Sequence, residues 1–360
     1  MTDLAPRLTR FRWELAAAEA AAALISGTAN IRYLSGFTGS YGALIVDAQA
    51  AYLVSDFRYR FQAAEQAPDF EFIEVRRWVE GVADAIRKLG YQAIGFEPAH
   101  LTHQVHGQLA AELPGIRLVP LNGMVEKLRA IKEPEELARI EQAAAISASA
   151  MQRVMSLVRP SISERELALA AEDYIKKEAG AELAFDPIVA SGTRSAQCHA
   201  EPGERALAAG DLVVIDVGAR WQGYGADVTR TVAVTEADAR RREMYAVCRQ
   251  AQAAGLAAIK AGVRCAELDR IAREVIERAG YGEAFGHGLG HGVGLETHEA
   301  PRLTAGEDSP LAANMTVTVE PGIYIAEVGG VRLEDLIVVT ENGCRVLTHA
   351  AKAPELPVLG

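Results

Sequence analysis

Four carboxylates lie inside otherwise apolar, strand-like segments of this 360-residue chain. They are Asp216 in VVIDVG, Asp227 in GADVTR, Glu320 in VTVEPG and Glu334 in VRLEDL. A buried carboxylate without a partner is strongly unfavourable or takes up a proton. Neighbouring negative charges repel by about 4 kcal/mol per pair at an effective dielectric constant near 20. The pattern therefore predicts a fold that gathers these acids around cations.

The segment AFGHGLGHGVGLETHE, residues 284–299, sets His287, His291 and His298 among glycines. Neutral imidazole is the commonest metal ligand, and glycine lets the backbone approach a ligand or adopt a positive φ. A Gly-rich surface loop with scattered histidines is the simpler alternative for this segment alone. Together with the four acids, His291 completes an oxygen-rich set that suits Mn²⁺, Co²⁺ or Fe²⁺, and a pair of such ions can activate water for hydrolysis.

The length of the chain predicts two domains, because one hydrophobic core usually stops growing at about 250–300 residues. Strand-like runs alternate with helical patterns over roughly the first 120 residues, as in a small α/β domain. The Pro-Glu-Glu at 134–136 then indicates the start of a long helix. We expect an N-terminal domain over 1–125 and a second domain over 126–360, with 126–133 as a helical linker.

The expected elements follow from hydrophobic periodicity and turn residues. In the first domain we expect strands at 42–47, 51–56, 70–75, 92–98 and 116–121, and helices at 15–25, 57–67 and 78–90. In the second we expect helices at 162–179, 236–260 and 264–279, and strands at 185–191, 211–219, 226–234, 315–325 and 331–340.

Composition narrows the class of protein. The hydrophobic share of 49% and charged share of 24% are typical of a soluble globular protein, and the net charge of -11 argues against nucleic-acid or anionic-membrane partners. No apolar run reaches the roughly 18–20 residues of a membrane span. The cysteines (Cys198, Cys248, Cys265 and Cys344) are scattered without a CxxC pair, so we expect reduced thiols and a cytoplasmic protein.

Several segments resemble a known family. DVGARWQGYGADVTRT, GHGLGHGVGLETHE, TVEPGIY and GVRLED, in this order, closely resemble the pita-bread metallopeptidases that cleave Xaa-Pro bonds, aminopeptidase P and prolidase. The resemblance covers roughly residues 126–350 by motif and residues 1–125 by size and style. It implies an α/β (α+β) chain with a small creatinase-like N-terminal domain, a pita-bread catalytic domain and a homodimeric assembly.

The resemblance also implies roles for individual residues. Asp216 would chelate one metal ion, His291 and Glu320 would bind the other, and Asp227 and Glu334 would bridge them. The two divalent ions would be Mn²⁺ first, with Co²⁺, Fe²⁺ or Zn²⁺ as alternatives.

Further residues match the family's peptide-handling positions. Glu320 would also be the general base, His298 would stabilise the oxyanion and His199 would bind substrate. His287 would line the proline pocket, and Arg332 would orient the site. The alternative for these four is a structural residue behind the ligands.

Other classes fit less well. Methionine aminopeptidase shares the five ligands but lacks the long N-terminal domain and the arginine before the last glutamate. Creatinase-like hydrolases keep two domains without the ligands. A non-catalytic pita-bread module that binds peptides, as in certain histone chaperones, would usually have lost ligands.

The choice between aminopeptidase P and dipeptidase depends on weaker features. A dipeptidase needs a positive group for the free carboxylate, commonly an arginine on an inserted loop, and no such insertion is evident. Asp56, Arg58 and Tyr59 in SDFRYRF resemble an Asp-x-Arg-Tyr motif of small bacterial aminopeptidases P, and Asp56 is equally suited to cap a helix. We therefore expect release of the N-terminal amino acid from peptides with proline second, with Xaa-Pro dipeptidase as the alternative.

Overall fold

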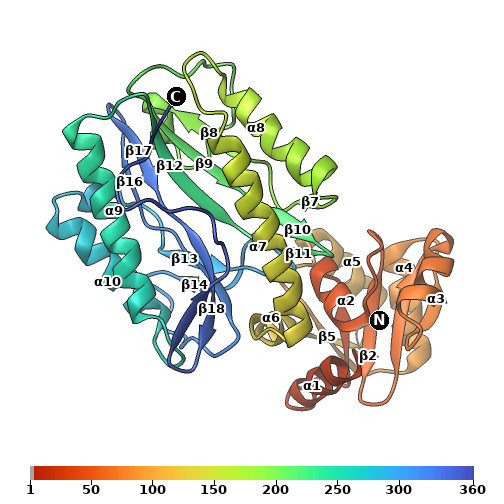
Figure 1. The fold of residues 1–360 in the computed structure, drawn as a ribbon. Helices are drawn as coiled ribbons and strands as arrows, with labels where there is room; N and C mark the ends of the chain where they lie inside the picture. The colour runs from red at the N-terminus through yellow and green to blue at the C-terminus, as the bar shows by residue number, and fades with distance from the viewer. Residues whose placement is uncertain (1–3) are drawn as a thin grey trace. The chain divides into compact units, whose positions relative to one another are not determined.

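The structure, a computed structural model, describes residues 4–360. The chain divides after Arg129 into two compact units (Figure 1). Each unit has a sheet framework and its own hydrophobic core.

Residues 4–129 form a six-stranded mixed sheet in the order β4-β3-β2-β1-β5-β6. The strands are β1 (Ala22–Ile25), β2 (Ala43–Asp47), β3 (Ala51–Ser55), β4 (Glu71–Glu74), β5 (Ala93–Phe96) and β6 (Arg117–Pro120). The helices are α1 (Ala5–Ala16), α2 (Thr28–Ser35), α3 (Arg60–Gln66), α4 (Trp78–Leu89), α5 (His103–Glu112) and α6 (Met124–Ala130), with a 3₁₀ turn η1 (Phe57–Tyr59).

The alanine-rich stretch 15–25 corrects one sequence expectation. We expected a helix there, but α1 ends at Ala16 and residues 22–25 form the inner strand β1. β1 is completely buried between β2, its antiparallel neighbour, and β5, its parallel neighbour. Pairing on both edges outweighs the helical preference of alanine, which is a weak local term.

Residues 130–360 combine long helices with several sheets. The helices are α7 (Pro134–Met155), α8 (Glu164–Asp173), α9 (Ala239–Ala258) and α10 (Cys265–Arg278), with short turns η2 (Tyr174–Glu178), η3 (Gly192–Ala196) and η4 (Gly282–Ala284). The strands are β7 (Glu182–Leu183), β8 (Ile188–Ser191), β9 (Leu212–Val217), β10 (Ala219–Trp221), β11 (Tyr224–Gly225), β12 (Val228–Val234), β13 (Gly290–Gly292), β14 (Glu299–Leu303), β15 (Thr316–Val319), β16 (Gly322–Ile325), β17 (Gly329–Arg332), β18 (Asp335–Thr340), β19 (Gly343–Val346) and β20 (Val358–Leu359).

Two pairs of helices cover two main sheets. Within the described residues, α7 and α8 pack against the sheet β20-β12-β9-β8, and α9 and α10 against the sheet β14-β13-β15-β18-β19 (Figure 1). α7 begins at Pro134 with Glu133 and Glu136 in a capping box, as the sequence pattern predicts.

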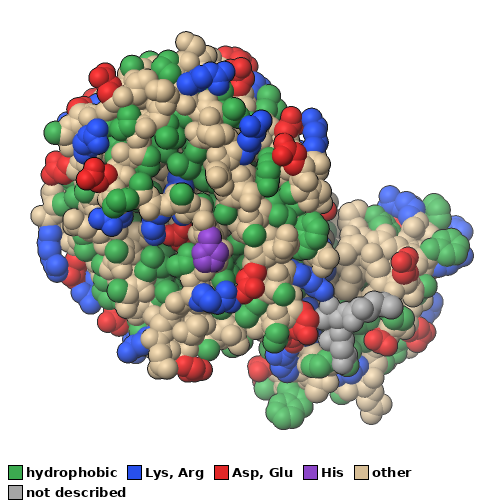
Figure 2. All heavy atoms as spheres, viewed as in Figure 1, with side chains coloured by type: hydrophobic (Ala, Val, Ile, Leu, Met, Phe, Trp, Pro, Cys, Tyr) green, Lys and Arg blue, Asp and Glu red, His purple; other side chains and the backbone are tan. Residues whose placement is uncertain are grey.

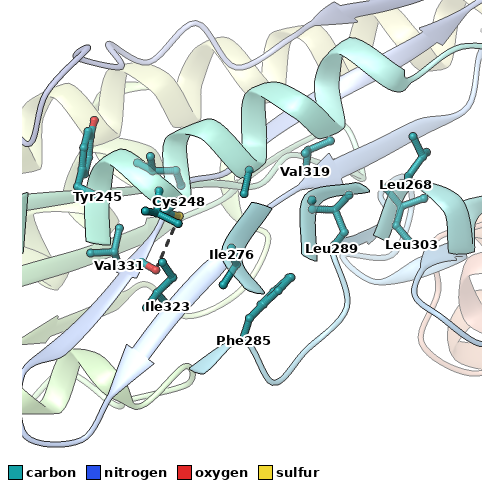
Figure 3. Close-up of a cluster of buried hydrophobic side chains, with 14 of the residues drawn as sticks. Tyr245, Cys248, Leu268, Ile276, Phe285, Leu289, Leu303, Val319, Ile323 and Val331 are labelled. Carbon is teal, nitrogen blue, oxygen red and sulfur yellow. Dashed lines mark hydrogen bonds between the residues drawn. The ribbon is translucent and has the colours of Figure 1, made fainter. Parts of the chain in front are cut away.

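The core under α9 and α10 supports the strands on either side of Glu320 and Glu334. Cys248 lies beside Ile323 and Val331 in this core, and Tyr245 and Ile276 belong to the same cluster (Figure 3). The buried Cys248 thiol donates to the carbonyl of Pro321 at 3.0 Å, and burial raises the pKa of that thiol to about 12. This hydrogen bond holds Pro321, the residue directly after Glu320, against α9.

Candidate metal centre and substrate pocket

The predicted metal ligands come from five separate places in the fold. Asp216 lies in β9 and Asp227 directly precedes β12, the antiparallel partner of β9. His291 lies in the short strand β13, which pairs with β15. Glu320 and Glu334 were expected within strands, but they occupy the breaks between β15 and β16 and between β17 and β18. A break frees the backbone to turn the carboxylate toward the other ligands.

These side chains converge. The Nε2 atom of His291 lies 3.2 Å from Glu320 Oε1 and 3.8 Å from Asp227 Oδ2. One ligand atom each from Asp227, His291 and Glu334 lies within 4.8 Å of the others. His291 Nδ1 donates to the carbonyl of Gly292 at 3.0 Å, so the lone pair of a neutral ring is on Nε2, which faces the acids.

Three buried carboxylate oxygens have no hydrogen-bond partner among the described residues: Asp216 Oδ1, Asp227 Oδ1 and Glu334 Oε1. The three residues are 7%, 5% and 1% exposed and lie at the inner wall of a pocket. Buried carboxylates of this kind are normally paired or bind metal. The donor set of carboxylate oxygens and one imidazole nitrogen fits divalent cations such as Mn²⁺ or Co²⁺.

The electrostatics agree with an incoming cation. Burial, and then the charges of Glu334 and Asp216, raise the pKa of Asp227 well above the usual carboxyl range. Burial and the charges of Glu320 and Asp216 do the same to the pKa of Glu334. Burial also acts to raise the pKa of Glu320, but its hydrogen bond with His291 and the charge of that ring bring it to about 2. A cation would replace the protons that the acids otherwise hold.

A chain of directed hydrogen bonds runs beside the ligands. Arg332 Nη2 donates to Asp216 Oδ2 at 2.6 Å, and Arg332 Nη1 donates to the hydroxyl of Tyr324 at 3.2 Å. His287 Nδ1 donates to the carbonyl of Gly288, so its Nε2 accepts from the Tyr324 hydroxyl at 3.0 Å. Burial lowers the pKa of His287, which favours this neutral ring. Tyr324 was not singled out from the sequence, although it lies four residues after Glu320 in TVEPGIY.

All of these groups line one pocket of about 890 Å³. His199 and His298 line it as well and are exposed, and the ring centroid of His298 lies 4.1 Å from that of His291. The protein around one side of its ring and the charge of His291 lower the pKa of His298. On the face of the larger unit shown in Figure 2, a histidine side chain is exposed with acidic and basic side chains around it.

Arg302 also lines this pocket and was missed by the sequence analysis. It pairs across β13 and β14 with His291, so the two side chains leave the sheet on the same face. It is exposed, and no hydrogen bond or ion pair joins it to a residue of the described chain. The alternation of β14, in which Glu299, Pro301 and Leu303 are buried and Arg302 is not, is the signal that would have placed it.

The glycines of 284–299 serve mainly the packing of β13. A Cβ atom at Gly290 would lie 2.1 Å from the carbonyl oxygen of Thr318, and one at Gly292 would lie 2.3 Å from that of Ala300. Glycine is therefore needed on both sides of His291 because neighbouring backbone approaches so closely.

Asp56, Arg58 and Tyr59 lie in the N-terminal unit. Asp56 accepts the backbone N–H of Arg58 at 3.0 Å and caps η1, and its carboxylate also pairs with the Arg58 guanidinium at 2.7 Å. The Tyr59 hydroxyl hydrogen-bonds that of Ser40 at 2.8 Å. These contacts have the geometry of the capping alternative, and a role in substrate binding stays a prediction.

The N-terminal unit also contains a Glu97, His100 and Glu126 cluster. Its carboxylates already have donors: Glu97 accepts from the backbone of Ser26 and Gly27, and Glu126 pairs with His100 at 2.8 Å. Hydrogen bonds account for this cluster, in contrast to the partnerless oxygens of the pocket in the larger unit.

Buried acids that face an open pocket, with histidines at its wall, define the site of a metal-dependent hydrolase. Residues 138–341 match metallopeptidase family M24, and residues 7–131 match the creatinase/prolidase N-terminal domain. The chain therefore belongs to metallopeptidase family M24, and its catalytic unit has the pita-bread fold that the motifs predict.

Similar proteins include Xaa-Pro dipeptidases and an X-Pro aminopeptidase. An Xaa-Pro dipeptidase from Pyrococcus horikoshii is 36% identical over 335 residues, or 92% of this chain and 93% of that protein. The structure of an Xaa-Pro dipeptidase from Bacillus anthracis has a TM-score of 0.94 at 38% identity and covers 99% of this chain and 100% of that one. The X-Pro aminopeptidase from Thermotoga maritima MSB8 has a TM-score of 0.90 at 35% identity and covers 98% of this chain and 99% of that one.

No helix within residues 4–360 is long and apolar enough to cross a membrane.

Proposed function

We propose that this protein is an Xaa-Pro dipeptidase that depends on two divalent cations. The cations would be held by Asp216, Asp227, His291, Glu320 and Glu334. The ligand atoms of Asp227, His291 and Glu334 lie together, Glu320 contacts His291, and three of the acids have a partnerless oxygen. When bound, such cations supply Lewis-acid activation of water and of the scissile carbonyl. Relatives named Xaa-Pro dipeptidase support the choice of bond.

The main support for a preference for dipeptides is the position of Arg302 in the pocket. A free proline carboxylate that enters an acidic pocket needs a positive partner, and the sequence analysis found none. Arg302 reaches the pocket from the same sheet face as His291 and has no partner of its own among residues 4–360. A guanidinium can bind a carboxylate through two parallel hydrogen bonds. It would hold the substrate terminus without any inserted loop.

The remaining pocket residues have roles that their chemistry supports. Glu320 lines the pocket with one carboxylate oxygen beside His291 Nε2, and an ionised carboxylate at this place could accept a proton from the attacking water. His298 has a lowered pKa and is neutral, and its N–H can donate to the developing oxyanion. His287, held by Tyr324, would form part of the wall around the proline ring, and His199 would contact substrate from the opposite segment of the pocket lining.

Aminopeptidase P is the second candidate, because the Thermotoga maritima structure with that kind of name is similar over nearly the whole chain. The two functions differ in whether a third residue is accepted. Mn²⁺ as the working ion, a homodimer and a cytoplasmic location complete the proposal. The scattered free cysteines of the described chain support a reducing location.

The test compares kcat/KM for Met-Pro, Met-Pro-Ala and the amide Met-Pro-NH₂ in the parent and in Arg302→Met. We expect the parent to prefer Met-Pro over the amide by about 10- to 100-fold, the worth of a charged hydrogen bond. Arg302→Met should lose this preference because it loses activity on Met-Pro alone. Arg345→Met, which removes an exposed charge paired with Glu141 away from the pocket, is the matched control. A parent that prefers Met-Pro-Ala, with a ratio unaffected by Arg302→Met, would establish the aminopeptidase.

A further inference from the structure

Two threonines follow Asp227 at alternate positions in GADVTRT. Side chains two positions apart on a strand lie on the same face, so Thr229 and Thr231 lie on the same face as Asp227. Thr229 is completely buried, and it lies directly opposite Asp216 on β9.

The Thr229 hydroxyl connects two residues of the site. Arg332 Nε lies 3.1 Å from Thr229 Oγ1, and Glu334 Oε2 lies 2.7 Å from it. A guanidinium can only donate, so Thr229 accepts from Arg332. Its single proton is then directed to Glu334. The direction of both hydrogen bonds, from Arg332 to Thr229 and from Thr229 to Glu334, is therefore fixed because the guanidinium has no acceptor atom.

This arrangement decides which oxygen of Glu334 remains for a cation. Oε2 is held by Thr229, while Oε1 is buried without a partner. The backbone N–H of Glu334 also donates to the carbonyl of Thr229 at 3.1 Å. Glu334 is thus tied to one residue of β12 by both its backbone and its side chain, although it lies in a break between strands.

The Thr229 hydroxyl also connects Glu334 with Asp216 through Arg332. Arg332 donates to Asp216 Oδ2 at 2.6 Å with one nitrogen and to Thr229 with another. Asp216, Arg332, Thr229 and Glu334 therefore form a continuous chain, in which each carboxylate has one oxygen engaged and the other partnerless. Rotation of either carboxylate would break a bond of this chain.

We propose that Thr229 is a positioning residue that holds Glu334 and Arg332 so that one oxygen each of Glu334 and Asp216 faces the metal centre. The proposal rests on the proposed metal centre and is independent of the choice between dipeptide and longer substrates. Partners that orient metal ligands in this way typically change metal affinity or activity by about 10- to 100-fold when removed.

Thr231 provides a matched control on the same strand. It is 1% exposed, and its hydroxyl binds only backbone groups, donating to the carbonyl of Arg332 at 2.9 Å and accepting its N–H at 3.0 Å. Thr229→Val and Thr231→Val therefore remove the same group from the same strand at equal burial. Only the first removes a contact with side chains of the site.

The experiment titrates MnCl₂ into metal-free protein by calorimetry for the parent, Thr229→Val, Thr229→Ser and Thr231→Val, with thermal unfolding of each metal-free variant as a folding check. We expect Thr229→Val to weaken Mn²⁺ binding by about 10- to 100-fold. Thr229→Ser, which keeps the hydroxyl, and Thr231→Val should bind Mn²⁺ nearly as the parent does.

Each other outcome contradicts the proposal in a distinct way. If Thr229→Val binds Mn²⁺ as the parent does, the hydroxyl does not position the ligands. If Thr231→Val weakens binding as much, the effect belongs to strand packing. If Thr229→Ser weakens binding as much as Thr229→Val does, a hydroxyl at this position does not restore the site, and the packing of the threonine side chain accounts for the effect. A folded parent that binds no divalent ion would instead refute the metal centre, and with it the proposed function.

Discussion

Lys132 and Glu299 form a buried ion pair, and breaking it should cost much of the stability of the catalytic unit. Lys132 Nζ lies 2.7 Å from Glu299 Oε1, and the two side chains are only 1% and 4% exposed. Glu299 packs against Gly294, where a Cβ atom would lie 2.4 Å from its Oε1. The pair thereby fixes the loop between His291 and His298.

Lys132→Met keeps the length of the side chain but removes the ammonium group that pairs with the buried Glu299 carboxylate. Removing one partner of a buried ion pair typically costs about 3–5 kcal/mol. The unit from Ala130 to Gly360 falls in the size range where 1 kcal/mol shifts Tm by about 2–4 °C, so Tm should fall by about 6–20 °C. Lys132→Met combined with Glu299→Leu should recover most of the loss, because both members of this ion pair are then replaced by apolar side chains.

Thermal and urea unfolding of metal-free protein would measure both variants. Lys177→Met is the control, since Lys177 pairs with Asp173 at 2.8 Å but is 74% exposed, and such pairs contribute little. The reasoning fails if Lys132→Met unfolds like the Lys177→Met control, or if the double variant is no more stable than Lys132→Met alone.

Further predictions follow from the pocket. His298→Ala should lower kcat by on the order of 10²-fold, as loss of an oxyanion donor does, with metal content near that of the parent. His291→Ala should lose metal as well, and metal analysis showing the reverse pattern would contradict these roles. In metal-free protein, the raised pKa values of Asp227 and Glu334 stabilise the fold below the usual carboxyl pKa of about 4, and this contribution is lost as pH rises through the folded values. Glu320, with its pKa of about 2, acts oppositely, and its contribution is lost only as pH falls toward 2. Urea unfolding from about pH 4 to pH 8 should therefore show stability falling with pH. Mn²⁺ should flatten that slope, and a rising slope without metal would refute the assignment.

Much of the fold could be predicted because local patterns agree with the tertiary structure. The strands expected at 42–47, 51–56 and 70–75 correspond to β2, β3 and β4, and the helix expected at 264–279 corresponds to α10. The helix predicted over residues 15–25 was wrong for residues 22–25. Their burial between two strands depends on distant residues, and it outweighed the local preference for helix.

The acids of the site could be found because a carboxylate within an apolar segment is anomalous by itself. Their exact setting could not, since Glu320 and Glu334 lie at strand breaks that depend on pairing with other segments. Arg302, Tyr324 and Thr229 are ordinary residues in the sequence. Their importance arises only from partners in space, such as the contacts of Thr229 with residues more than one hundred positions away.

The measurement that tests the account most directly is Met-Pro hydrolysis as a function of the divalent metal bound per chain. Metal-free protein, verified by elemental analysis, would be reconstituted stepwise with Mn²⁺ and assayed at each step. The account predicts no hydrolysis without metal and full activity when two ions are bound, because Asp216, Asp227 and Glu334 then all have their cation. Full activity in verified metal-free protein, or a folded protein that binds no Mn²⁺, would contradict it.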